Sequence, residues 1–311
     1  MTRVAIIGAG ISGLACARQL AKAGVSVVVF DKGRGIGGRV ATRRAGDLQF
    51  DHGAPFVRAQ RDDFSALLAS LTVDGSAVPW TDDKGVTWTV GSPGMSAIPK
   101  AMGVGLDVRL GTQILKVNAN QSGWHLHYDE TEYVATHIVM TVPKPQIAGL
   151  LGYRHPLIPQ IADVKMEPGL TLMATVSGST PSITPFLPDD PLALITCDSS
   201  KPNRPLNEST AWVAQAGTEF SVTHLEKNLP DIAALMLPLL CERLDVTLSR
   251  ITHAVAHRWR YSRVSKALGQ PFVSTPDRTL YLGGDWCVGP DIEDAWTSGM
   301  AIAQDLLERE L

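Results

Sequence analysis

Few residues of this sequence could support a metal site, a dithiol centre or a disulfide framework. Among 311 residues there are only four cysteines, Cys16, Cys197, Cys241 and Cys287, and no two form a Cys-x-x-Cys pair. Such wide spacing argues against structural zinc and against paired redox thiols. Each cysteine is therefore expected to be a reduced, small apolar side chain, and no metal is expected.

Strong charge and long apolar runs are also lacking. The net charge of −3 gives no general electrostatic attraction for nucleic acid or for an anionic membrane. The longest apolar runs, such as residues 232–240, are interrupted by Pro238 and are too short to cross a bilayer. Glycines interrupt the first apolar stretch and no basic leader precedes it, which argues against a secretion signal. We expect a cytoplasmic protein with no nucleic-acid or membrane partner.

The most informative pattern lies at the start of the chain. Residues 4–7 form a short β-branched run typical of a parallel strand that is buried on both faces. Apolar residues between 14 and 21 then recur at helical spacing, with Gly24 where a helix would stop. Residues 25–30 form a second apolar run that ends at Asp31. The order predicts a strand, a helix and a second strand.

A glycine turn, Gly8-Ala9-Gly10-Ile11-Ser12-Gly13, joins the first strand to the helix. Gly8 permits a tight turn, Gly10 lets the backbone approach a pyrophosphate, and Gly13 allows close packing of helix on strand. The helix N-terminus would add unpaired N–H groups for the anion. Asp31 could accept hydrogen bonds from the two hydroxyls of an adenosine ribose. The alternative is an ordinary strand–helix–strand start with chance glycines, because the chain has 28 of them.

A second strand, glycine and acid unit occurs further on. Residues 279–282 predict a strand, Gly284 and Asp285 follow it, and a helix is expected from about Ile292. Asp285 could accept hydrogen bonds from the ribityl hydroxyls of a flavin. The N–H groups near Ile292 and Glu293 could stabilise negative charge on a reduced flavin. A plain surface turn before a helix is the alternative.

A local basic segment follows the second strand. It contains Arg34, Arg39, Arg43 and Arg44. Arg39 could pair with a pyrophosphate, while the other three could be merely solvated.

The remaining sequence predicts a mixed fold. Helices are expected at 61–71, at 95–102 and, with interruptions at Pro230 and Pro238, at 225–244. Strands are expected within 80–90 and at 106–110, 113–119, 123–128, 132–142, 211–216 and 251–261, and the proline-rich segment 153–208 contains apolar runs at 170–176 and 192–195. The expected fold class is α/β plus α+β: a Rossmann-type FAD-binding domain with an inserted mixed-sheet substrate domain. The FAD-binding domain is assigned to 1–72, 98–152 and 271–311, and the substrate domain to 73–97 and 153–270.

Motifs over essentially the whole chain resemble renalase, within the amine-oxidase-like group of FAD-dependent enzymes. Those shared by many flavoproteins are the turn at 8–13 with Asp31, Gly37-Gly38-Arg39, Gly284-Asp285-Trp286-Cys287, Glu293, Ala295-Trp296 and Ser298-Gly299. Those that resemble the bacterial branch of renalase are Gly53-Ala54, Gly94-Met95-Ser96-Ala97-Ile98, Thr141-Val142-Pro143-Lys144-Pro145 and His257-Arg258-Trp259.

The resemblance implies FAD held noncovalently. The glycine turn and Asp31 would take the ADP half, the Ile114 backbone would lie near the adenine, and Asp285 would meet the ribityl and phosphate portion. The cofactor-binding residues expected in this way are Gly8, Gly10, Ser12, Gly13, Asp31, Lys32, Gly38, Arg39, Gly53, Ala54, Ile114, Gly284, Asp285, Ile292 and Glu293.

The implied activity is oxidation of the 2- and 6-dihydro isomers of NAD(P)H to NAD(P)⁺, with oxygen as acceptor and hydrogen peroxide as product. A dihydropyridine can give hydride directly to flavin N5, so no acid–base dyad is required. One departure concerns Gly53-Ala54-Pro55-Phe56, where related enzymes often have Gly-Ala-Gln-Tyr. The loss of a polar side chain and a hydroxyl near the flavin weakens the inference about substrate.

The strand expected at 251–261 provides candidates for the substrate pocket. Its alternation places His257 and Trp259 on one face, and Trp296 is a third candidate. Arg258 or Arg260 could reach a substrate phosphate. The structural alternative is strong, because aromatic residues at alternate strand positions are more often core, and a lone histidine is more often structural than catalytic.

Two other functions remain open. A flavin amine oxidase or desaturase would share every FAD motif, so the motifs cannot separate it from a dihydronicotinamide oxidase. A nonenzymatic flavin- or nucleotide-binding redox sensor is the second alternative.

Overall fold

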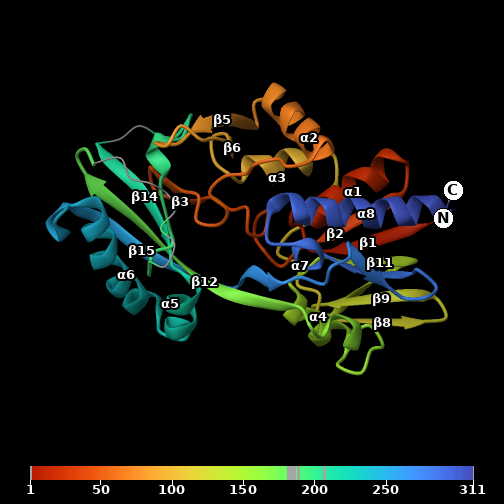
Figure 1. Cartoon of the computed structure of the whole chain (residues 1–311). Helices are drawn as coiled ribbons and strands as arrows, with labels where there is room; N and C mark the ends of the chain where they lie inside the picture. The colour runs from red at the N-terminus through yellow and green to blue at the C-terminus, as the bar shows by residue number, and fades with distance from the viewer. Residues whose placement is uncertain (1, 181–186, 188–189, 206–207, 311) are drawn as a thin grey trace. The chain divides into compact units, whose positions relative to one another are not determined.

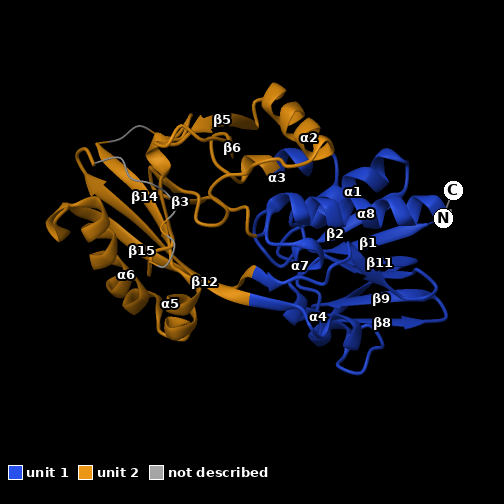
Figure 2. Ribbon diagram, viewed as in Figure 1, with its two compact units in different colours: residues 1–38, 99–166, 264–311 blue, residues 39–98, 167–263 orange. Residues whose placement is uncertain are grey.

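The computed structural model describes residues 2–180, 187, 190–205 and 208–310. The chain forms two compact units, each assembled from separate stretches of sequence (Figure 2). Unit 1 contains residues 1–38, 99–166 and 264–311, and unit 2 contains residues 39–98 and 167–263. Residues 39–72, which we assigned to the FAD-binding domain, belong to unit 2 by their packing. The functional roles of the two domains stay a prediction.

A six-stranded sheet forms the centre of unit 1, in the order β16-β17-β11-β1-β2-β7. Its strands are β1 (Arg3–Ile7), β2 (Ser26–Phe30), β7 (Asp107–Arg109), β11 (His137–Met140), β16 (Phe272–Ser274) and β17 (Leu280–Gly283). All neighbours pair in parallel except β16, which runs antiparallel to β17. Residues 4–7 of β1 are at most 5% exposed, so the strand predicted to be buried on both faces is confirmed.

Helices α1 (Ile11–Lys22) and α8 (Ile292–Glu310) lie side by side in unit 1 (Figure 1). A Cβ atom on Gly299 of α8 would lie 2.1 Å from the main-chain oxygen of Ser12, so only glycine permits this approach. Further helices are α4 (Lys144–Leu151), α7 (Asp285–Val288) and the 3-10 turn η1 (Pro159–Ile161). Helix α3 (Ala97–Met102) includes the boundary between the units.

A second, three-stranded antiparallel sheet of unit 1 has the order β10-β9-β8. Its strands are β8 (Lys116–Asn120), β9 (Gly123–Tyr128) and β10 (Thr131–Ala135). The single strand predicted at 132–142 is wrong, because the chain leaves this sheet after Ala135 and enters the parallel sheet as β11. Thr136 marks the change, since its N–H donates to the carbonyl oxygen of Arg3 at the start of β1.

Unit 2 contains a four-stranded sheet in the order β13-β14-β12-β15. Its strands are β12 (Lys165–Ser177), β13 (Leu194–Cys197), β14 (Ser209–Gln215) and β15 (Ile251–Lys266). Helices α5 (Thr218–His224) and α6 (Leu229–Leu244) and the 3-10 turns η2 (Asp198–Ser200) and η3 (Leu248–Arg250) complete this part. Trp212, Leu172 and Met236 lie in the core formed between the sheet and α6.

Two hairpins and a helix form the rest of unit 2. They are β3 (Arg43–Ala45) with β4 (Leu48–Phe50), β5 (Ala77–Thr81) with β6 (Thr87–Gly91), and α2 (Asp62–Val73). Phe50 of β4 packs with Met173 of β12 and Val213 of β14, which joins the first hairpin to the four-stranded sheet.

Helix α6 corrects the prediction of a helical region interrupted by prolines. Pro230 lies in the first turn, where its missing N–H has no intrahelical partner to lose, and Asn228 caps that turn by accepting from the N–H of Asp231. Pro238 lies inside the helix, which continues through it to Leu244. Among the described residues, the helices are too short or too polar to traverse a bilayer.

Candidate functional site

The predicted glycine turn in unit 1 is held by two hydrogen bonds at Gly8. Gly8 has a φ of +115° and donates its N–H to the carbonyl oxygen of Phe30 at 2.8 Å. The Thr141 hydroxyl donates to the carbonyl oxygen of Gly8 at 3.0 Å. A Cβ atom on Gly13 would lie 2.0 Å from the same oxygen, so Gly13 lets α1 pack on the turn, as predicted.

Gly10 and Ser12 have surroundings that fit a phosphate-bearing ligand. A Cβ atom on Gly10 would meet no protein atom within 4 Å, so the lack of a side chain there is not explained by protein packing. The Ser12 hydroxyl is buried at the first turn of α1 and has no hydrogen-bond partner among the described residues. A buried hydroxyl without a partner costs free energy, and a phosphate oxygen at this helix N-terminus would satisfy it.

Asp31 connects the glycine turn with the segment that follows β2. One carboxylate oxygen accepts from the N–H of Ala9 at 2.7 Å and the other from the N–H of Gly33 at 2.6 Å. Each oxygen keeps a second lone pair for a ribose hydroxyl. The N–H of Gly37 donates to the carbonyl oxygen of Ala9 at 2.9 Å, so the Gly37-Gly38 motif lies beside the turn. Lys32 is exposed, with its ammonium 3.4 Å from the Gln146 side-chain oxygen.

The second acid unit lies at the end of β17. Gly284 has a φ of +140° and donates its N–H to the Ser298 hydroxyl of α8 at 2.9 Å. That hydroxyl donates in turn to the carbonyl oxygen of Pro271 at 2.7 Å, so α8 fixes the turn that carries Asp285. Asp285 begins α7 and is 6% exposed. A buried carboxylate at this point can accept from ligand hydroxyls.

Three further predicted cofactor residues lie in unit 1. Ile114 is buried in the same core as Phe30 and Ile138. Ile292 begins α8 as predicted, and Glu293 follows it at 5% exposure. Because Glu293 and Asp294 both occupy the first turn of α8, protein carboxylates already compensate part of the positive end of its dipole.

Arg39, Gly53 and Ala54 come together in unit 2. The N–H of Ala54 donates to the carbonyl oxygen of Arg39 at 2.9 Å, and a Cβ atom on Gly53 would lie 1.9 Å from that oxygen. The Arg39 guanidinium donates to the carbonyl oxygen of Ser262 on β15 at 3.0 Å. Two motifs that are separate in sequence therefore form one backbone contact, which requires glycine at position 53.

The substrate-pocket candidates His257 and Trp259 form a cluster with His52, which the sequence analysis missed. The His52 ring stacks on the indole of Trp259 with 5.2 Å between ring centroids and meets the edge of His257 at 4.8 Å. His257 and Trp259 contact each other at 4.4 Å. The indole N–H of Trp259 donates to the carbonyl oxygen of His52 at 3.0 Å. Trp296 is buried on α8 in unit 1.

The electrostatic environment of this aromatic cluster favours neutral imidazoles. The pKa of His52 is lowered to about 4, first by burial and then by the charges of His257 and Arg43, whereas Asp51 acts in the opposite direction. The pKa of His257 is lowered by burial and by Arg43. Nδ1 of His52 is buried and has no hydrogen-bond partner among the described residues. Both rings are therefore uncharged at neutral pH and present flat aromatic faces.

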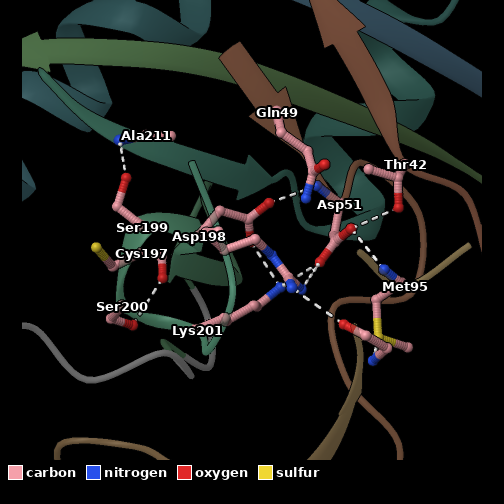
Figure 3. Close-up of polar contacts among 12 residues, drawn as sticks. Thr42, Gln49, Asp51, Met95, Cys197, Asp198, Ser199, Ser200, Lys201 and Ala211 are labelled. Atoms are coloured by element: carbon pink, nitrogen blue, oxygen red, sulfur yellow. Dashed lines mark hydrogen bonds and ion pairs between the residues drawn. The ribbon is translucent and has the colours of Figure 1, made fainter. Parts of the chain in front are cut away.

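A buried ionic cluster holds the residue immediately before His52 (Figure 3). The Asp51 carboxylate lies 3.1 Å from the Lys201 ammonium and 2.6 Å from the Arg204 guanidinium. Lys201 lies 2.6 Å from Asp198, whose carboxylate also accepts the Asp51 N–H. Asp51 further accepts from the Thr42 hydroxyl at 2.7 Å and the Met95 N–H at 2.9 Å. The two acids and two bases give the cluster no net charge.

The pKa values of the two acids in the ionic cluster shift in opposite directions. Burial raises the pKa of a carboxyl, but Lys201 and Arg204 outweigh this at Asp51, so its pKa is below the ordinary value. The pKa of Asp198 is raised by burial and, after the opposing effect of Lys201, by the negative charge of Asp51. Asp51 is therefore the acid whose charged form is more strongly stabilised, and it fixes the segment that carries His52, Gly53 and Ala54.

Phe56 shows what the departure from Gly-Ala-Gln-Tyr does in this chain. Its ring stacks on Trp88 at 4.1 Å and on Trp80 at 6.1 Å between centroids. The position therefore contributes an apolar aromatic stack in unit 2. No group of three or more potential metal-ligating side chains occurs in the described part of the chain.

Comparisons with known proteins identify the family. Residues 80–307 match the family described as flavin containing amine oxidoreductase, and residues 6–71 match the NAD(P)-binding Rossmann-like domain. The chain belongs to the flavin-containing amine oxidoreductase family. Proteins of this family carry FAD, which is the cofactor of this chain. The open space at Gly10 and the unpartnered Ser12 hydroxyl fit that cofactor.

Two relatives of known name match short stretches of the chain. AofH of Mycobacterium tuberculosis, named as a flavin-containing monoamine oxidase, is 37% identical over 70 residues, which are 22% of this chain and 15% of AofH. Protoporphyrinogen oxidase 2 of Arabidopsis thaliana is 36% identical over 69 residues, which are 22% of this chain and 14% of that protein. The matched stretch thus spans well under a fifth of either relative.

A solved structure extends the likeness to the whole fold. Cyclohexylamine oxidase from Brevibacterium oxydans IH-35A aligns with a TM-score of 0.77 over 99% of this chain and 100% of its own, at 14% identity. The Rossmann-type domain and mixed sheet expected from the sequence are therefore confirmed as the amine-oxidase fold. At this identity the likeness concerns the fold alone.

Proposed function

We propose that this FAD-dependent oxidoreductase oxidises the 2- and 6-dihydro isomers of NAD(P)H to NAD(P)⁺, as the resemblance to renalase implies. When bound, FAD would accept the hydride and pass its two electrons and proton to oxygen, which takes a second proton from solvent to give hydrogen peroxide. The dihydropyridine ring loses only a hydride, so the protein has to orient the ring rather than remove a second proton.

The observation that carries this proposal is the neutral aromatic cluster of His52, His257 and Trp259 next to a cation. Flat aromatic faces suit a nicotinamide ring by stacking. Arg43 lowers the pKa of both histidines, so its positive charge acts on the aromatic cluster and opposes the binding of an ammonium group there. The carboxylate that acts on His52, Asp51, is neutralised by Lys201 and Arg204. A neutral ring is thus favoured over a cationic amine.

Residues of unit 1 supply the cofactor side of the proposal. The Ser12 hydroxyl and the N–H groups at the start of α1 would bind pyrophosphate, and Asp31 would accept from the ribose. Asp285, positioned by Ser298 of α8, would accept from the ribityl hydroxyls. Arg39, Gly53 and Ala54, which belong to unit 2, are the remaining cofactor-binding residues that the sequence predicts.

The amine oxidase or desaturase alternative fits the family match equally well, because the matched family is described as flavin containing amine oxidoreductase. Anaerobic reduction of the flavin separates the two proposals. The purified FAD-loaded protein is mixed without oxygen with 6-dihydro-NAD, with ordinary NADH, or with a panel of amines that includes putrescine and cyclohexylamine. Rapid loss of the oxidised-flavin absorbance with 6-dihydro-NAD alone supports the proposal. Loss with an amine and none with 6-dihydro-NAD overturns it.

A variant pair tests the aromatic cluster itself. His257→Gln removes the ring that contacts both His52 and Trp259, so we expect about tenfold slower flavin reduction by 6-dihydro-NAD. His253→Gln is the matched control, since His253 lies four residues earlier on the same strand and stacks on Phe50. Equal slowing in both variants would show a general effect on β15. A protein that is colourless and cannot be reconstituted with FAD would instead favour the redox-sensor or nucleotide-binding alternative.

A further inference from the structure

The two arginines suggested by the sequence for a substrate phosphate are engaged within unit 2. Arg260 makes a two-pronged contact with the Glu226 carboxylate at 2.7 and 3.0 Å. Arg258 donates to the carbonyl oxygen of Lys227 and lies 3.8 Å from Glu226. A bidentate arginine–carboxylate pair is strong and geometrically fixed, so these side chains are poor candidates for an incoming anion.

Arg43 is a better candidate for a substrate phosphate than those two arginines, because of its position beside the aromatic cluster. It is the first residue of β3 and pairs directly with Phe50 of β4, and directly opposed residues of an antiparallel pair project from the same face. The Phe50 ring stacks on His253 of β15 with 5.8 Å between centroids. His257 lies further along the same face of β15, and His52 lies two residues after Phe50. The backbone register thus directs Arg43 towards the aromatic cluster.

The effect of the Arg43 charge on the two histidines of the cluster agrees with this register. The Arg43 charge lowers the pKa of both His52 and His257, which agrees with a guanidinium directed towards the cluster. Arg43 is exposed, and no residue in the described ranges forms a hydrogen bond or ion pair with it. An exposed cation beside a neutral aromatic cluster has five N–H donors available for a ligand.

We propose that Arg43 binds the phosphate group of a dihydronicotinamide nucleotide and thereby selects nucleotide over nucleoside substrates. The inference rests on the proposed function, because it assumes that the nicotinamide ring meets His52, His257 and Trp259. Arginine suits this role, because its planar fork binds phosphate through two hydrogen bonds.

Phosphate binding also removes an electrostatic obstacle. Loss of hydride leaves the nicotinamide ring positively charged, and an unpaired Arg43 would oppose that charge. A phosphate on the substrate neutralises the guanidinium at the moment when the ring becomes cationic. Arg43 would therefore act on binding and, through its neutralisation, on the rate of hydride loss.

The test compares two substrates and three variants. The substrates are the 6-dihydro forms of nicotinamide mononucleotide and of nicotinamide riboside, which differ only in the phosphate. Arg43→Gln removes the charge, Arg43→Lys keeps the charge without the fork, and Arg44→Gln is the matched control. Arg44 is the next residue of β3, pairs with Gln49 and projects from the opposite face. Rates of anaerobic flavin reduction are measured, together with equilibrium binding of oxidised nicotinamide mononucleotide from the change in flavin absorbance.

For Arg43→Gln we expect KM and the nucleotide dissociation constant to rise about tenfold, the strength of one charge-assisted interaction. Its kcat on the riboside should be equal to or above that of the unaltered protein, since the unpaired charge is gone. Arg43→Lys should recover part of the loss, and Arg44→Gln should behave as the unaltered protein. Equal losses on both substrates, or a loss shared by Arg44→Gln, would overturn the role of Arg43. Failure of both substrates to reduce the flavin of the unaltered protein would overturn the proposed function instead.

Discussion

Trp259 and His52 are joined twice: the indole N–H of Trp259 donates to the carbonyl oxygen of His52 at 3.0 Å, and their rings stack 5.2 Å apart. The two residues come from β15 and from the segment after β4, so the stack forms only when both pieces of unit 2 are in place. One side of His52 is thus fixed by Trp259, and the preceding residue, Asp51, is fixed by the ionic cluster.

The glycine turn gives a prediction that separates cofactor binding from folding. Gly10→Ala adds a methyl group that meets no protein atom, so the variant should fold with unchanged stability but bind FAD at least tenfold more weakly. Gly13→Ala would place its methyl 2.0 Å from the Gly8 oxygen and should lower the stability of the protein itself. Flavin content and urea unfolding of the cofactor-free protein measure the two effects. Full flavin retention by Gly10→Ala would contradict the pyrophosphate assignment.

Asp285 gives a second test of the cofactor site. Asp285→Asn keeps the shape of the side chain but removes its charge and one acceptor, and Asp285→Ala removes both acceptors. We expect FAD affinity to fall about tenfold or more, and the loss should be larger for Asp285→Ala than for Asp285→Asn. Flavin-to-protein ratios after extensive dialysis and titration of the cofactor-free protein measure it. Glu308→Gln, on the exposed part of α8, is the control, and unchanged affinity in both Asp285 variants would remove this carboxylate from the site.

The ionic cluster predicts a loss of stability. Asp51→Asn leaves two buried cations facing only Asp198, so we expect the free energy of unfolding to fall by about 3 kcal/mol or more. Asp163→Asn is the control, because it breaks an exposed pair with Lys266 and should cost at most about 1 kcal/mol.

A neutral double variant checks the cause. Asp198→Asn with Lys201→Met removes one charge of each sign and leaves Asp51 paired with Arg204, so its cost should be smaller than the sum of the single variants. Urea midpoints of all variants provide the measurement. Additive costs would show that charge balance is not what stabilises the cluster.

His52 predicts how stability depends on pH. Its pKa in the folded protein is about 4, below the ordinary value of 6.5, because of burial and then the charges of His257 and Arg43. The unfolded chain therefore binds more protons between these values, and stability falls as pH drops from about 6.5 towards 4, by about 3 kcal/mol from this group. Unfolding free energies of the unaltered protein and of His52→Gln, measured across this range, should show a shallower slope for the variant. Parallel slopes would exclude His52 as the titrating group.

Local patterns were sufficient to predict the start of the fold. The β1–α1–β2 order, the turn at Gly8–Gly13 and the Gly284-Asp285 unit depend on residues that are near one another in sequence, so periodicity and glycine spacing reveal them. The break of the strand predicted at 132–142 could not be found in this way, because it depends on a hydrogen bond from Thr136 to Arg3 in a distant strand.

No local sequence pattern of this kind predicted the ionic cluster. Asp51 and Asp198 are 147 residues apart, and the segment containing Asp198 and Lys201 reads as a polar loop. His52 was missed because its role as a candidate pocket residue depends on its contacts with His257 and Trp259, which are distant from it in sequence. The position of an acid directly after the alternating run Leu48-Gln49-Phe50 was the available hint, since such an acid continues a buried strand and needs a partner.

The contact between α1 and α8 restricts when the nucleotide-binding fold can be completed during synthesis. Gly299 lies against the Ser12 backbone, and Ser298 holds the turn before Asp285, so both glycine-containing turns depend on a helix encoded far downstream of α1. The ribosome must synthesise α8 before that helix can pack, and until then α1 lacks the helix that lies beside it. Cofactor capture is therefore expected to follow synthesis of α8, rather than to guide the folding of the first residues.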